Sequence, residues 1–203
     1  MKFEEYDLNG KILRIPIAES YKDCMELIRS DRYRKYGKNN ESTWNILRDV
    51  FRPFNRDVLF WLRLTSYAGI FYPICRIIYT MVSRESQIQI SPTTKIGYGF
   101  YIGHEICMVV NSGTIIGNNV NLSQFLNIGT NKCTPAIIGD NVYIGPMVCI
   151  VEDVVIDSNV MIGAGAVVVK SVPENAVVAG VPAKIIKYSD SNRRNGPYFY
   201  TIK

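Results

Sequence analysis

Residues 136–168 read AIIGDNVYIGPMVCIVEDVVIDSNVMIGAGAVV, and an apolar residue recurs at every sixth position of this stretch. A period of six matches neither the 3.6 residues of a helical turn nor the two-residue alternation of a plain strand. It is typical of a solenoid whose coils are built from short strands joined by corners. We name these apolar positions rungs, and here they are Ile138, Ile144, Ile150, Ile156, Ile162 and Val168.

The same step extends upstream to Ile96, Ile102, Val110, Ile116, Leu122 and Ile128. A second small or apolar residue lies four positions after most rungs, as at Val120, Val142, Val148, Val154, Val160 and Ala166. Glycine directly follows many rungs, and we expect it at corners because it adopts backbone angles that other residues resist: Gly97, Gly103, Gly117, Gly129, Gly139, Gly145 and Gly163. The pattern favours a parallel β-helix with three hexads per coil over the alternative of a β-sandwich.

The period is interrupted twice. Two residues are added between Ile102 and Val110, and four are added between Ile128 and Ile138. Loops that leave a rigid scaffold often carry functional residues. His104, the only histidine in the chain, lies in the first interruption, where it is a candidate for proton transfer.

The composition of the 203 residues is that of a globular protein, with 47% apolar residues, 20% charged residues and a net charge of +5. This length predicts one or two domains with real cores. The mild basic excess indicates a solvated surface, or else an anionic ligand or a membrane surface, and we expect no nucleic-acid partner. The basic residues gather at Arg29, Arg32, Arg34, Lys35 and Lys38 and again at Arg193-Arg194.

The cysteines form no CxxC pair and are odd in number, and no signal peptide follows Met1. Free thiols in a reducing cytoplasm are therefore expected. One histidine and the scattered cysteines Cys24, Cys75, Cys107, Cys133 and Cys149 make no metal-ligand set, so we expect no metal.

Residues 1–86 are predicted to form a small α-helical domain after an irregular lead-in. The lead-in, residues 1–19, contains a turn at Asn9-Gly10 and a short strand after it. One helix is expected from Ser20 to Gly37, and a second is expected to begin at Ser42 or Thr43 and to end before Pro53.

Residues 57–82 are the most apolar stretch of the chain. Arg63 and Arg76 argue against a membrane span, as do Gly69 and Pro73. Two helices joined near residues 69–73 fit better, with their apolar faces packed on one another and on the base of the solenoid. A weak membrane-surface contact through this stretch is the alternative.

The rungs, the closing stretch AGVPAK at 179–184 and the segment IGAGA at 162–166 resemble the hexapeptide-repeat acyltransferases. The resemblance implies a left-handed parallel β-helix over residues 87–188 and a homotrimer. Residues 189–203 form a C-terminal tail to which we assign no role. Within the group, SPTTKIG at 91–97 and YIGH at 101–104 resemble the serine acetyltransferases, and more closely their relatives in capsule and exopolysaccharide gene sets.

The resemblance implies that His104 is the general base of an acetyl transfer from acetyl-CoA to a hydroxyl group. An imidazole suits this step because it can accept a proton at physiological pH. Serine acetyltransferases carry an aspartate at the position of Gln89 and another at that of Gly103, which puts free serine in doubt as the acceptor. The candidates for orienting the imidazole are Glu105, Gln89, a backbone carbonyl and Gln124. The register stacks Gln124 near His104.

Acetyl-CoA in such proteins lies in a groove between two subunits, against backbone groups of small residues. The resemblance therefore implies binding at Gly145-Pro146 and Gly163-Ala164. It implies phosphate contacts for Lys170 and Lys184, with Lys187 as a further candidate. A solvated surface position is the alternative for each of these lysines.

These features predict an O-acetyltransferase that acts on a sugar hydroxyl of a surface polysaccharide or of its precursor. The alternatives are a serine O-acetyltransferase of cysteine synthesis and a non-catalytic β-helix scaffold. A γ-type carbonic anhydrase is excluded, because its zinc site needs three histidines and this chain has one. The sequence does not identify the acceptor, or decide between a trimer and a larger assembly.

Overall fold

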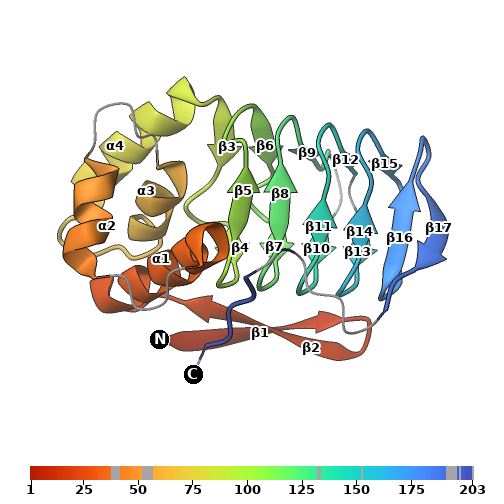
Figure 1. The fold of residues 1–203 in the computed structure, drawn as a ribbon, viewed down its shortest axis with the longest axis horizontal. Helices are drawn as coiled ribbons and strands as arrows, with labels where there is room; N and C mark the ends of the chain where they lie inside the picture. Colours follow the sequence, from red (N-terminus) through yellow and green to blue (C-terminus); the bar gives the residue numbers. More distant parts are fainter. Residues whose placement is uncertain are drawn as a thin grey trace.

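The computed structural model describes residues 1–37, 42–51, 57–131, 134–151, 153–190, 196 and 198–202. Several residues singled out from the sequence lie outside these ranges, namely Lys38, Pro53, Cys133 and the pair Arg193-Arg194. The chain forms a parallel β-helix with helices at its N-terminal end and a β-hairpin along one side, as Figure 1 shows.

Three parallel sheets form the walls of the β-helix. The first sheet contains β4 (Lys95–Ile96), β7 (Ile115–Ile116), β10 (Ile137–Ile138) and β13 (Val155–Ile156). The second contains β5 (Tyr101–Gly103), β8 (Asn121–Ser123), β11 (Tyr143–Ile144), β14 (Met161–Ile162) and β16 (Ala176–Ala179), with β17 (Lys184–Tyr188) antiparallel at its edge. The third contains β3 (Ile88–Ile90), β6 (Met108–Val110), β9 (Asn127–Ile128), β12 (Cys149–Ile150) and β15 (Val167–Val168).

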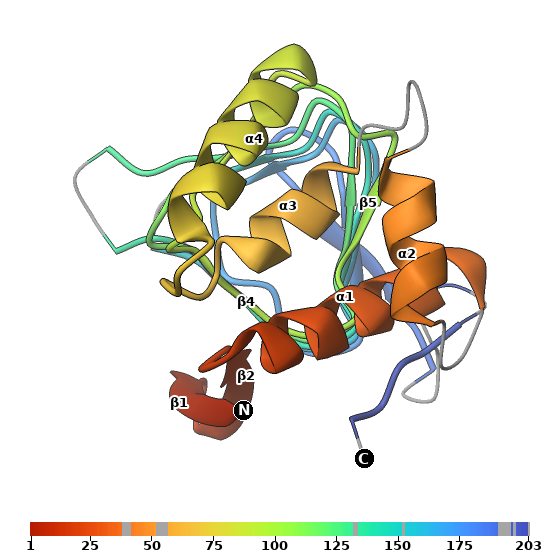
Figure 2. The same cartoon turned by 90° about the vertical axis from the view of Figure 1, so that its left-hand side faces the viewer.

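The strand register confirms the coil length and both interruptions. Ile137 pairs with Val155, so a regular coil takes 18 residues, or three hexads. Lys95 pairs with Ile115, a coil of 20 residues, and Ile115 pairs with Ile137, a coil of 22. The two long coils contain the inserted residues, and Figure 2 shows the described residues that follow β9 and that precede β10 projecting away from the solenoid.

The core of the solenoid consists of the rungs and their partners four residues later. Every rung is at most 6% exposed, and the partners from Val120 to Ala166 are at most 3% exposed. Burying an isoleucine or a valine contributes about 1.5–3 kcal/mol. The predicted core is therefore confirmed, and its stacked apolar rows are the main stabilising feature of the β-helix.

The glycines that follow the rungs serve a different purpose from the one predicted. None of the seven has a positive φ. A Cβ at Gly117 would lie 2.4 Å from the carbonyl oxygen of Gly139, and one at Gly97 would lie 2.5 Å from the backbone of Gly117. Close approach of neighbouring coils, and not backbone freedom, therefore requires glycine at these positions and also at Gly139 and Gly145, whereas a Cβ at Gly103 or Gly129 would meet nothing closer than 3.5 Å.

Asparagine occupies the left-handed position at one series of corners. Asn119, Asn141 and Asn159 have φ between 55° and 62°, a region that asparagine tolerates better than most residues. The Asn141 side-chain amide also donates to Asn159 Oδ1 at 2.7 Å. These corners thus stack on one another through their side chains.

The predicted helices are confirmed with their caps. Helix α1 (Tyr21–Tyr36) begins after Ser20, whose hydroxyl accepts from the Asp23 amide, and ends at Gly37 with φ of 69°. Ser42 caps α2 (Thr43–Val50) in the same way. The apolar stretch forms α3 (Val58–Leu64) and α4 (Tyr72–Glu85). We name α1 to α4 together the helical cap.

The lead-in is not irregular. Residues 1–19 form a complete hairpin of β1 (Lys2–Leu8) and β2 (Lys11–Ile17), with the expected turn at Asn9-Gly10. Its buried residues Leu8, Leu13 and Ile15 pack against the outer face of the first sheet at Ile115, Ile137 and Val155. The hairpin is ordered because this face offers an apolar surface that only the three-dimensional fold assembles.

Helix α3 covers the open N-terminal end of the solenoid, where Leu59 and Leu62 join its core (Figure 2). We expected both helices to bury their apolar faces, and α3 does so. Helix α4 is only partly buried, because one of its apolar faces is exposed. Ile70 just before the helix, and Ile74, Ile77 and Met81 on it, are 58–84% exposed. Among the described residues, no helix is long and apolar enough to cross a membrane, and contact with a membrane surface stays a prediction.

Residues 198–202 of the C-terminal tail lie beside the helical cap, next to the N-terminal end of the solenoid (Figure 1). The backbone of Tyr200 exchanges two hydrogen bonds with the side chain of Asn119, at 2.9 and 3.0 Å. The Tyr200 hydroxyl donates to Glu26 Oε1 at 2.6 Å, and the Arg34 guanidinium donates to the carbonyl of Tyr198. The end of the chain therefore ties α1 to the coils.

A buried ion pair joins the helical cap to the first coil. Arg63 on α3 donates to both oxygens of Asp31 on α1, at 2.7 and 3.0 Å, and both side chains are less than 5% exposed. Arg63 also donates to the carbonyls of Ile96 and Gly97. Asp31 accepts from the amide of Phe100 at 2.8 Å. Two helices and the first coil are thus held at one point.

We predict that Asp31→Ala lowers the free energy of unfolding by about 3–5 kcal/mol, because it leaves the Arg63 guanidinium buried without its counterion. Urea-induced unfolding followed by circular dichroism measures the change. Glu5→Ala, which removes the exposed partner of Arg14 on the hairpin, is the control and should have little effect. Equal losses in the two variants would show that the buried pair is not the junction described here.

Candidate active site

The sequence-predicted site residues other than Lys170 gather along one edge of the solenoid, where the second sheet turns into the third. Ile144 pairs with Leu122 and with Ile162, and Ile102 pairs with Leu122. The corners that follow these rungs therefore stack on one another, and we name them the site edge. In order from the helical cap they carry His104, Gln124, the pair Gly145-Pro146 and the pair Gly163-Ala164.

His104 belongs to the two residues inserted at the first corner of this edge. Gly103 pairs with Ser123, and the Phe125 amide donates to the carbonyl of Ile106 at 3.5 Å, so His104 and Glu105 have no counterpart in the next coil. The Ile106 amide closes a tight turn onto the His104 carbonyl at 2.7 Å. The histidine has φ of 56° and is exposed. The insertion thus displays the imidazole on the surface of the edge.

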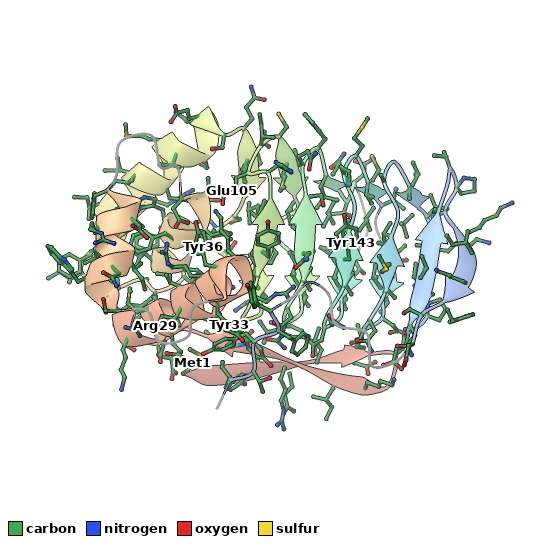
Figure 3. All side chains as sticks on the ribbon, viewed as in Figure 1. Met1, Arg29, Tyr33, Tyr36, Glu105 and Tyr143 are labelled. Atoms are coloured by element: carbon green, nitrogen blue, oxygen red, sulfur yellow. The ribbon has the colours of Figure 1, made fainter. Side chains whose placement is uncertain are left out.

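Glu105 faces the helical cap. Its carboxylate accepts from Lys35 Nζ on α1 at 3.2 Å and from the Val58 amide at the first turn of α3 at 3.3 Å. Figure 3 shows Glu105 where the cap meets the second sheet. Burial raises the pKa of Glu105, and the charge of Asp57 adds to this, whereas Lys35 lowers it. Glu105 therefore anchors the loop that displays His104.

This anchor is not visible in the sequence. Lys35 and Glu105 are 70 residues apart, and neither belongs to a motif that indicates a contact. The insertion at 102–110 is visible as a break in the period, but the break predicts Glu105 as a partner of the imidazole and not as a contact of the helical cap. No hydrogen bond joins Glu105 to His104 within the described chain.

Gln124 lies on the site edge, one coil beyond His104. Its backbone neighbour in the preceding coil is Ile106, because the register resumes after the insertion, and its carbonyl accepts from the Met147 amide at 3.0 Å. Gln89 lies on β3 opposite Val109 and is exposed. At Gly103 an added Cβ would meet its nearest atom at 3.5 Å, an ordinary contact, so packing does not exclude a side chain there.

The later corners of the site edge form a path of small residues, Gly145-Pro146 and Gly163-Ala164-Gly165. A Cβ at Gly145 would lie 2.9 Å from the Ala164 nitrogen, whereas a Cβ at Gly165 would meet nothing within 4 Å. The Ala164 amide has no acceptor among the described residues.

The two predicted lysines lie at different corners. Lys184 pairs with Ala179 on β16, and Ala179 lies beside Gly163, so Lys184 is at the far end of the site edge. Lys170 follows β15, at the corner where the third sheet turns toward the first. Both are exposed. The structure thus brings Lys184 and not Lys170 to the small-residue path. Within the described ranges no group of side chains could hold a metal ion.

An exposed apolar row accompanies the site edge. Ile106, Phe125 and Met147 occupy its outer corners and are 45%, 52% and 65% exposed. Phe125 and Met147 also have φ near 60°, which holds their side chains outward at the corner. Such a row next to a candidate site indicates a contact surface.

The chain is similar to known proteins over the solenoid and beyond it. The family described as bacterial transferase hexapeptide (six repeats) matches residues 135–170. A serine acetyltransferase of Staphylococcus xylosus is 32% identical over 157 residues, which cover 67% of this chain and 71% of that protein. One of Buchnera aphidicola is 32% identical over 129 residues, so this chain spans about half of that relative, 49%.

Solved structures of serine acetyltransferases share the fold. The enzyme of Neisseria gonorrhoeae in complex with serine has a TM-score of 0.64 and 25% identity, covering 82% of this chain and 70% of that one. A serine acetyltransferase in complex with CoA has a TM-score of 0.64 and 22% identity, covering 81% and 70%.

We predict that the stability of the wild type falls relative to that of Glu105→Gln as the pH rises above 4.5, the ordinary pKa of this carboxyl group. The sign follows because a pKa that is raised in the folded state favours the protonated form, and deprotonation at higher pH then costs folding free energy. Urea titrations between pH 3 and pH 7 measure the difference. A wild type that gains stability over the variant across this range would contradict the burial of Glu105.

Proposed function

The chain belongs to the hexapeptide-repeat transferase family, and on that basis we propose that it transfers the acetyl group of acetyl-CoA to a hydroxyl group. The supporting observation is the position of His104, the only histidine, on a two-residue insertion at the head of a path of small residues. The relatives named serine acetyltransferases support acetyl transfer, and the structure with CoA supports acetyl-CoA as the donor.

The proposed step is direct transfer. The imidazole of His104 removes the proton of the acceptor hydroxyl as its oxygen attacks the thioester carbonyl. The carbon–sulfur bond then breaks, and the proton passes from the imidazolium to the CoA sulfur. A backbone amide of the site edge stabilises the oxyanion. No covalent intermediate on the protein is needed, because both substrates are held together.

Two acceptor classes are proposed. L-serine is supported by the names of the relatives and by the solved complex with serine, and these comparisons give no support to a sugar. A sugar hydroxyl of a surface polysaccharide is supported by the residues at the site, because Gln89 and Gly103 stand where the resemblance places aspartates. Crowding does not explain why glycine occupies position 103, because a larger side chain would have room there.

Gln124 is proposed to orient the imidazole, since it is the polar side chain that follows His104 along the site edge. We expect Gln124→Ala to lower kcat about tenfold and to leave the KM for acetyl-CoA unchanged, because orientation of a base acts on the chemical step. Steady-state kinetics measure both parameters. An unchanged kcat would assign the orientation to Gln89 or to a backbone carbonyl instead.

The active form is proposed to be a homotrimer in the cytoplasm. The apolar row of Ile106, Phe125 and Met147 supports a second copy beside the site edge, where acetyl-CoA would lie between subunits. The described cysteines are all free thiols, which supports a reducing compartment: Cys24, Cys75, Cys107 and Cys149.

Thiol release from acetyl-CoA tests the proposal, with L-serine and then a panel of sugars as acceptors. We expect His104→Ala to lower kcat about 10²–10⁴-fold, because the base acts in the transition state. Thiol release only with L-serine would show that the acceptor is serine. Thiol release only with sugars would support acetylation of a surface polysaccharide or its precursor. A chain that neither binds CoA nor releases thiol would be a non-catalytic scaffold.

The shared-site proposal predicts that Met147→Asp dissociates the trimer and abolishes activity. Aspartate tolerates the left-handed backbone at this corner, so the fold should be preserved. Light scattering during gel filtration measures the mass. Val169→Asp, at an exposed position of another corner, is the control. Full activity in a monomer would refute a site shared between subunits.

A further inference from the structure

A polar groove lies between α4 and the first coil, and the comparisons assign it no role; of its residues only Gln89 was considered above. Its lining includes Arg76, Thr80 and Arg84 on α4, and Gln87, Gln89 and Ser91 along β3. Figures 1 and 2 show α4 beside the N-terminal end of the third sheet. No acidic side chain is among the residues that line the groove.

The two arginines of the groove are available to a ligand. Both are exposed, and neither forms an ion pair within the described part of the chain. Arg76 makes one ring contact, with its guanidinium carbon 5.8 Å from the centre of the Tyr79 ring. A guanidinium group presents several N–H donors in a plane that matches a carboxylate or a phosphate.

One residue of the groove lining, Gln87, connects the groove to the loop that carries His104. The thiol of Cys107, three residues after the histidine, donates to Gln87 Oε1 at 2.7 Å. Gln87 lies at the end of α4 that carries Arg84, and β3 then runs back along the helix. Tyr79 on α4 donates to the carbonyl of Ile90 at the other end of the strand. Arg84 is therefore the guanidinium nearer the His104 loop, and Arg76 lies farther along the groove.

The spacing of the arginines sets the size of the ligand. Eight residues separate them on α4, which places them about 12 Å apart along the helix axis. One extended amino acid spans only about 3.5 Å. A free amino acid can thus engage Arg84 but cannot reach both cations. A chain of sugars that carries anionic groups can engage both, while its hydroxyls face the amides of Gln87 and Gln89.

We propose that this groove is the acceptor subsite and that it binds an extended acidic saccharide, with carboxylate or phosphate groups on Arg84 and Arg76. The proposal rests on the acetyl transfer proposed above, since it takes the groove as the approach to His104. It concerns the acceptor alone and makes no demand on the path for acetyl-CoA at the later corners.

Calorimetric titration of the CoA-bound protein with trigalacturonic acid tests the proposal, and the fully methyl-esterified trimer is the uncharged counterpart. The acid should bind at least tenfold more tightly than the ester, and its affinity should fall as salt is raised. Arg84→Gln and Arg76→Gln should each weaken binding of the acid about tenfold, because each removes one charged contact. Arg48→Gln, which removes an exposed arginine of α2 outside the groove, should bind like the wild type.

Two results would overturn the proposal, namely no binding of the acid by the wild type and equal binding by the wild type and both groove variants. Acetyl-CoA binding, measured separately in each protein, distinguishes this failure from failure of the proposed function. If acetyl-CoA binds and thiol release depends on His104 while the acid does not bind, acetyl transfer stands and the groove assignment fails. If acetyl-CoA does not bind, acetyl transfer itself fails.

Discussion

The buried contact between Asp31 and Arg63 fixes the helical cap on the first coil, and the candidate site depends on that junction. A β-helix has stable internal coils because each coil covers the apolar row of the next, but its first coil has no predecessor. Helix α3 supplies the missing cover, and the ion pair orients it through carbonyls of the first coil. Glu105 adds a second tie between the same helix and the loop of His104. The cap thus stabilises the open end and positions the catalytic candidate.

The same arrangement explains why the site lies near one end of the solenoid. Two extra residues can be accommodated where the cap can hold them, as Lys35 and the first turn of α3 do for Glu105. The small-residue path farther along the edge needs no such support, since its shape follows from the repeat itself.

Much of the fold was predictable because the repeat is local. The rungs, their partners, the helix caps at Ser20, Ser42 and Gly37 and both interruptions follow from sequence spacing and were confirmed. The hairpin, the exposed face of α4 and the anchoring of Glu105 were not predictable, because each depends on surfaces brought together from distant parts of the chain. The glycines were identified correctly and explained wrongly, since spacing reveals a repeat but not how closely its coils approach. The roles of His104, Gln124 and the small residues stay predictions.

The central claim is that the site edge and the loop anchored by the helical cap form one active site. A crystal structure of the protein with CoA bound tests this claim most directly. The account predicts the CoA sulfur within about 3.5 Å of the His104 imidazole, a near-attack distance, and the pantetheine arm along Ala164 toward Lys184. A sulfur atom seated at another corner of the solenoid, away from His104, would contradict it.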